Sequence, residues 1–184
     1  MSQMAATQIR DHFYFLFREY GPVAHTLEWH GSPVTFERLA RINNLRQTLA
    51  DTCNLLFEAV GKERASYFIH QYVNSEAFTP NPHVAPANSF LTFLVSRYRR
   101  FPRIASAAAV LAMRSSIDSN DSAALASLPV CSVTDESIDI KIYADVFGLA
   151  DWPTAQTIQE AKLIPTIIRA TMAENGQAVV RKVP

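Results

Sequence analysis

The side chains that most often carry out chemistry are few in this sequence, and they stand far apart. The five histidines are His12, His25, His30, His70 and His83. No two of them have the spacing of a helical or strand metal pair, and neither Cys53 nor Cys131 has a partner at metal-ligand spacing. The sequence also contains no glycine-rich nucleotide loop and no nucleophile elbow. We therefore predict no catalytic residue and no metal site in this chain.

The two cysteines are too distant in sequence to suggest a disulfide framework. Cys53 lies within a helical pattern and Cys131 lies near a predicted strand. We expect each to be a buried apolar thiol, which is the commonest environment of a free cysteine.

Two polar groups and one loop histidine are candidates for contacts with a partner. "RINN" places polar side chains at the front of a long helix, and "SRYRRFPR" gathers arginines near a helix end, where the macrodipole also favours cations. A solvated helix face and ordinary helix-end charges remain open as alternatives. The candidates for a partner interface or for contact with acidic side chains are Arg41, Asn43, Asn44, His83, Arg97 and Arg100.

Helical periodicity dominates the first two thirds of the chain. Apolar residues recur every three or four positions over 4–20, 36–60, 62–73, 87–101 and 102–117. Gly61 is a plausible helix stop, and Pro102 suits a first helical position. Asn88 or Ser89 is expected to cap the fourth helix. The segment "SEAFTPNPHVAP" is too rich in proline for regular structure.

Strand patterns appear only after Asp121. Isoleucines alternate with charged residues over 138–142, which predicts a half-buried strand. Asn175–Gly176 predicts a tight hairpin turn between two further strands. Pairing outward from that turn sets Met172 opposite Val179 and Ala170 opposite Arg181. Because a lone hairpin is marginal in water, we expect the three strands to form one sheet.

These patterns predict an α+β protein that is mostly α. Residues 1–121 would form a helical bundle of about five helices, and residues 122–184 a small β-rich domain with a three-stranded antiparallel sheet that ends in the hairpin. The polar run "DSNDS" is the expected boundary.

Composition narrows the classes of function. Seventeen basic residues balance seventeen acidic ones, which argues against nucleic-acid binding because such domains usually carry a basic excess. No apolar run is long enough to span a membrane, and the start of the chain lacks the pattern of a signal peptide. We expect a cytoplasmic protein with no nucleic-acid and no membrane partner.

Several segments together resemble one known family. "RINNLRQTLADTCNLLFEAVGKERASYFIHQYV", "PANSFLTFL", "FPRIASAAAVLAM" and "PTIIRATMAENGQAVVRKV" resemble successive helices and the closing hairpin of the HvfC/BufC-type N-terminal domain family. The resemblance covers roughly residues 36–184. The chain departs from the family at Ala40, where a tyrosine is usual, and at Met113–Arg114. Its compact length resembles the methanobactin biosynthesis (MbnC-like) branch.

The resemblance implies a role as a non-catalytic partner subunit. Such proteins form a heterodimer with an MbnB-like TIM-barrel iron oxidase, which converts cysteines of an MbnA-like precursor peptide to oxazolone and thioamide groups of a copper-chelating peptide. The resemblance implies that this chain holds no cofactor and that the partner holds iron. It also implies that this chain does not catalyse the reaction alone, although the oxidase complex requires this subunit. The chain would help to bind the leader of the precursor peptide, which can add a strand to a sheet edge. The residues expected there are Ile138, Ile140, Ile142, Ile168, Arg169 and Thr171.

Two other functions fit the same resemblance. The chain could serve a related barrel oxidase that acts on another precursor peptide. It could also be a DNA-binding regulator, as an older label of the family suggests, and a steep salt dependence of DNA binding would support that alternative.

Overall fold

The computed structural model describes residues 33–75, 77–78, 86–134, 136–173 and 178–183. The chain divides into two compact units, Met1–Glu37 and Arg38–Pro184. All the packing described below lies within the second unit. The helix expected over residues 4–20 lies outside the described residues.

Four long helices follow one another in the order that periodicity predicts. They are α2 (Pro33–Val60), α3 (Lys62–Val73), α4 (Pro86–Arg97) and α5 (Pro102–Asp118). Gly61 separates α2 from α3 at φ 82°, a conformation that glycine adopts at little cost. Two short helices, α6 (Ser122–Ala126) and α7 (Ala155–Glu160), follow later in the chain. Asp121 caps α6, and Thr154 forms a capping box with Thr157 in α7.

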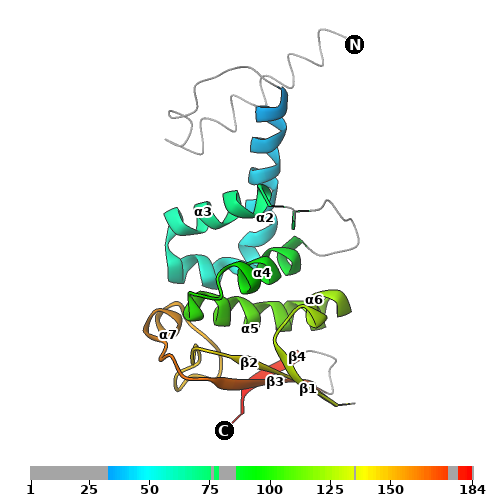
Figure 1. Cartoon of the computed structure of the whole chain (residues 1–184), viewed down its shortest axis with the longest axis vertical. Helices are drawn as coiled ribbons and strands as arrows, with labels where there is room; N and C mark the ends of the chain where they lie inside the picture. The colour runs from blue at the N-terminus through cyan, green and yellow to red at the C-terminus, as the bar shows by residue number, and fades with distance from the viewer. Residues whose placement is uncertain (1–32, 76, 79–85, 135, 174–177, 184) are drawn as a thin grey trace. The chain divides into compact units, whose positions relative to one another are not determined.

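The helix α5 lies between α4 and a sheet, as Figure 1 shows. Every residue from Ser106 to Met113 is buried, so this helix has no solvent-facing stripe over two turns. Five of these eight residues are alanine or serine, and such small side chains allow close packing on both sides. The core therefore continues from the helices through α5 into the sheet.

The sheet is antiparallel and contains four strands in the order β1-β2-β3-β4. The strands are β1 (Val130–Val133), β2 (Ser137–Ile142), β3 (Thr166–Met172) and β4 (Ala178–Lys182). The α+β class, mostly α, with an antiparallel C-terminal sheet is confirmed. The sequence predicts three strands, and the additional one is β1, which has four exposed residues and hence no alternating burial that a sequence pattern could reveal.

The predicted hairpin register is wrong by one residue. Ala170 lies opposite Val180 and Met172 lies opposite Ala178, so an odd number of residues separates the paired strands. A two-residue turn centred between Asn175 and Gly176, which lie outside the described residues, would leave an even number. The one-residue difference reverses the faces of β4: Val180 is buried, and Arg181 is exposed.

Two local predictions are also wrong. Neither Asn88 nor Ser89 caps α4, because the helix starts at Pro86. Asn88 is fully buried, and its amide donates to Ser119 Oγ and Asp121 Oδ2, both at 3.0 Å. Cys131 is exposed on β1, whereas Cys53 is buried as predicted. Burial raises the pKa of the Cys53 thiol to about 12 because the thiolate would lose its hydration.

Candidate functional site: the open face and edges of the sheet

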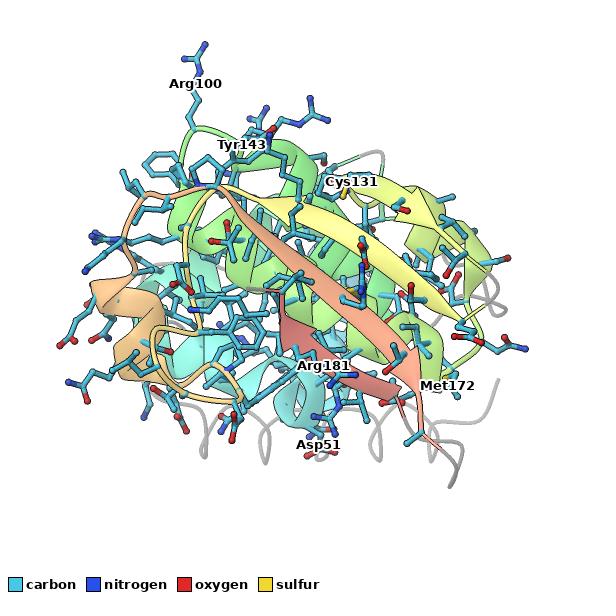
Figure 2. All side chains as sticks on the ribbon, turned by 90° about the horizontal axis from the view of Figure 1, so that it is seen from below. Asp51, Arg100, Cys131, Tyr143, Met172 and Arg181 are labelled. Atoms are coloured by element: carbon cyan, nitrogen blue, oxygen red, sulfur yellow. The ribbon has the colours of Figure 1, made fainter. Side chains whose placement is uncertain are left out.

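The sheet has one face against α5 and one open face. Ile140, Ile142 and Ile168 point toward α5 and are buried. The intervening residues of the same strands point the other way, toward the viewer in Figure 2. This open face, as we call it, consists of Ser137, Asp139, Lys141, Ile167, Arg169, Thr171, Val179 and Arg181. Ile167 and Val179 keep 43% and 40% of their surface exposed, so the open face carries apolar as well as charged area.

An ion pair occupies the centre of the open face. Asp139 and Arg169 are direct cross-strand partners. Arg169 donates from Nε to Asp139 Oδ1 and from Nη2 to Oδ2, each at 2.8 Å. This two-bond contact holds the pKa of the Asp139 carboxyl below its ordinary range, although burial of the carboxyl opposes the shift. Arg169 is therefore neutralised within the sheet.

Two further cations on the open face have no such partner among the described residues. Arg181 lies directly opposite Arg169, a like-charge pair that disfavours the sheet. Neither Arg181 nor Lys141 forms an ion pair with another residue in the described part of the chain, whereas Lys182 on the opposite face is paired with Asp145 at 3.0 Å. The open face therefore carries two cations that an acidic group of a ligand could contact.

The edge strand β1 is fully exposed and contains a bulge at Cys131. Pro129 O accepts from Lys141 N at 3.0 Å, and Thr134 N donates to Ser137 O at 2.8 Å. Since main-chain groups alternate in direction along an antiparallel strand, Val130 and Val133 turn theirs away from β2. Val130 N donates locally to Leu128 O at 2.8 Å. The outward main-chain groups of β1 are thus the Val130 carbonyl and both groups of Val133.

The other edge strand, β4, is longer but less accessible. Val183 N donates to Ile167 O, so the outward main-chain groups belong to Ala178, Val180 and Lys182. Ala178 N already donates to Asp118 Oδ1 at 3.4 Å, and Val180 exposes only 6% of its surface. An incoming strand would therefore find more accessible backbone at β1 than at β4.

The residues predicted from the sequence for peptide binding all lie on the two central strands. Ile138, Ile140 and Ile142 are on β2, and Ile168, Arg169 and Thr171 are on β3. Their backbone groups face neighbouring strands, and three of the isoleucines belong to the core. Among the six, Arg169 and Thr171 present side chains to the open face. The edge that they were expected to form is covered by β1.

The residues predicted for a partner interface do not form one cluster that the structure describes. Arg97 and Arg100 are exposed at the end of α4 and in the turn after it, and Asn43 is partly exposed on α2. Arg41 and Asn44 also belong to α2, but their side chains lie outside the described part, as does the whole of His83. Arg97 and Arg100 are the two members that share a location.

A groove of 480 Å³ lies between α2, α5 and the loop that carries Trp152. Its walls include Asp51, Arg114 and Asp118, and the guanidinium of Arg114 lies 4.9 Å from the Trp152 ring centroid. Arg114 also pairs with Asp118 at 3.7 Å, so one of the two carboxylates is already balanced. The sequence gives no sign of this groove because its residues come from three distant segments.

Comparison of the chain with protein-family models, with characterised proteins and with solved structures found no match. Within the described residues, no three His, Cys, Asp or Glu side chains are placed to hold a metal ion. None of the helices in that same part combines the length and apolarity needed to cross a membrane.

Proposed function

We propose that this chain is an MbnC-like subunit that binds a precursor peptide and pairs with an MbnB-type barrel iron oxidase. The oxidase would carry the iron and the chemistry, and this chain would hold the leader of the peptide. The proposal joins the family resemblance of residues 36–184 to one observation, namely a four-stranded sheet with an open face and an exposed edge strand. An open sheet edge is the usual platform for an extended peptide.

The edge at β1 supports this function better than the central strands predicted from sequence. A peptide beside β1 can donate to Val130 O and exchange bonds with Val133. Its alternate side chains would extend the row formed by Ser132, Asp139 and Arg169 across the open face. Long side chains of the peptide could then approach the charged centre of that face.

Cys131 provides a direct readout of peptide binding because it is exposed in the middle of β1. Alkylation of its thiol by iodoacetamide would be followed by mass spectrometry, with and without a synthetic MbnA-type leader peptide. We expect saturating peptide to slow the reaction about tenfold or more, because an added strand covers the edge. An alkylation rate that no peptide concentration changes would contradict binding at β1.

A backbone variant tests the same contact independently. Val133→Pro removes an N–H that points away from the sheet, so the fold should tolerate it on an edge strand. The variant should lose peptide binding, and Val133→Thr, which keeps the N–H, should retain it. Equal peptide affinity in both variants would argue against strand addition at this edge.

The pairing with an oxidase is tested by co-expression with an MbnB-type enzyme. A one-to-one complex on size exclusion, with iron in the complex and none in the isolated chain, is the expected result. An isolated chain that elutes alone in the presence of the oxidase would contradict the proposed subunit role.

A further inference from the structure

The N-terminal end of α5 joins three segments that are far apart in sequence. Arg103 Nε donates to the carbonyl of Ala161 at 2.9 Å, which fixes the segment after α7 against α5. Ser106 Oγ accepts from the main-chain N–H of Tyr143 at 3.1 Å and of Ala144 at 3.0 Å, which fixes the end of β2 there too. The turn before α5 therefore lies beside both segments.

Strand pairing brings the two later segments next to each other. Ile142 is paired with Thr166, and Asp145 forms a bridge with Lys162. Tyr143 lies between these two pairs, so residues 163–165 lie beside it on the adjacent segment. The side chains of Tyr143, Leu163 and Ile164 consequently share one end of the sheet.

Four large apolar side chains at this end are exposed. Phe101 and Tyr143 each keep 58% of their surface exposed, Leu163 keeps 61% and Ile164 keeps 52%. We call these four residues the end surface. Single exposed apolar residues are ordinary, but a group of four from three segments is typical of an interaction site.

The base of the end surface is well packed. The ring of Phe101 lies 6.0 Å from that of Tyr98, which in turn lies 4.6 Å from the buried ring of Phe68. An exposed aromatic ring that rests on packed rings loses little freedom when a partner covers it. This favours Phe101 as an anchor for binding.

The sequence neighbours of Phe101 carry positive charge alone, and Asp145, two residues after Tyr143, is already paired with Lys182. Arg99 and Arg100 directly precede Phe101, and no aspartate or glutamate occurs from residue 77 to residue 117. Figure 2 shows Arg100 and Tyr143 at the same end of the described structure. Aromatic residues with arginine at their rim are enriched in protein interfaces. The matching surface on a partner would be apolar at its centre and acidic at its rim.

We propose that the end surface docks a folded protein whose apolar patch is bordered by carboxylates. In the assembly proposed above this protein is the barrel oxidase, so the identity of the partner rests on the proposed function. The docking site is then separate from the β1 edge, which stays available to the peptide. The end surface includes Arg100, already a candidate from the sequence, at its rim and adds Phe101 and Tyr143 as its anchors.

The test measures the affinity of an MbnB-type oxidase for variants of the full chain. The double variant Phe101→Ala/Tyr143→Ala should bind at least about 100-fold more weakly, because central aromatic residues dominate interface energy. Arg100→Glu should weaken binding about tenfold and reduce its dependence on salt, since a rim charge acts mainly through electrostatic attraction. Leu149→Ala, at a fully exposed leucine outside the end surface, is the matched control and should bind normally.

Circular dichroism would check that the variants fold, and peptide protection of Cys131 would check that the β1 edge is intact. Normal oxidase affinity in the double variant, with the wild-type complex present, would overturn this inference and leave the proposed function standing. Failure of the wild-type chain to bind the oxidase would overturn both. Equal losses in Leu149→Ala and in the double variant would also overturn it, because the effect would not belong to the end surface.

Discussion

The helix α5 and the sheet beneath it differ in how many of their sides are covered. Over residues 106–113 the helix is buried on every side, because α4 packs on one side and the sheet on the other. Along β3 the burial alternates, and only the side chains toward α5 are buried. The buried part of a helix between two layers can only stabilise the fold. A sheet with one covered face can stabilise the fold through that face and bind a ligand through the other.

The largest expected difference between the two regions is in thiol reactivity. Cys53 in the helical layer has a pKa of about 12, whereas the exposed Cys131 lies on β1. At pH 7.5 the thiolate fraction of Cys53 should be roughly three-thousandfold below that of an ordinary thiol near pKa 8.5, and its burial slows attack further. Ellman's reagent should therefore label one thiol in the native chain and two after unfolding. Rapid labelling of two native thiols would contradict the buried environment of Cys53.

Two adjacent isoleucines in β3 compare the faces of the sheet directly. Ile168 is fully buried and Ile167 is 43% exposed. Ile168→Ala should lower the free energy of unfolding by about 2–5 kcal/mol, because it leaves a cavity against α5. Ile167→Ala should lower it by less than about 1 kcal/mol. Urea denaturation measures both, and similar losses would mean that the open face is packed as well.

An enlarged side chain in α5 tests the two-sided packing. Ala112 is fully buried, so Ala112→Leu should destabilise the fold by about 1–3 kcal/mol through overpacking. Ala123→Leu on the exposed side of α6 is the control, and it should be nearly neutral. If thermal unfolding of Ala112→Leu matched the wild type, α5 would have room on at least one side.

The smallest effect is expected for the ion pair on the open face. Because the pKa of Asp139 is lower in the folded chain than in the unfolded one, the pair stabilises the fold fully above about pH 4. That stability is lost as the pH falls through the folded-state pKa. The Arg169→Met variant should therefore have a lower free energy of unfolding than the wild type at pH 7. This difference in free energy should become smaller in acid.

The control for this pH dependence is Arg181→Met on the neighbouring strand. Arg181 forms no ion pair with the described carboxylates, so its removal should give no difference that narrows in acid. Parallel stability curves for Arg169→Met and the wild type from pH 7 to pH 3 would show that the pair contributes nothing through ionisation.

The sequence predicted those elements whose burial follows a period. Helices α2 to α5 and strand β2 lie where the apolar residues recur, and Gly61 ends α2 as expected. The strand β1 has no such signal because all four of its residues are exposed. The predicted hairpin register is wrong because it assumed a two-residue turn at the Asn-Gly pair. The apolar pattern of β4 could not correct this assumption, because either register places one valine on each face.

The candidate site was less predictable because it depends on tertiary contacts. The sequence identified Arg169, but it could not show that Asp139 already binds this arginine and that Arg181 and Lys141 are left without an ion partner among the described residues. Strand pairing brings Tyr143 beside Leu163, and the hydrogen bonds of Arg103 and Ser106 bring the turn with Phe101 to the same end. Tertiary hydrogen bonds of this kind leave no periodic trace in a single sequence.

The bulge at Cys131 has a consequence for how long a bound peptide would stay. It spaces the outward main-chain groups of β1 three residues apart, at Val130 and Val133, where a regular strand would repeat them every second residue. An added strand could then form about three main-chain hydrogen bonds, each worth roughly 1 kcal/mol. So few main-chain hydrogen bonds would let the peptide dissociate rapidly from the edge. The side-chain contacts of the peptide would then set its residence time. A substrate that must leave after it has been modified requires such release for repeated turnover.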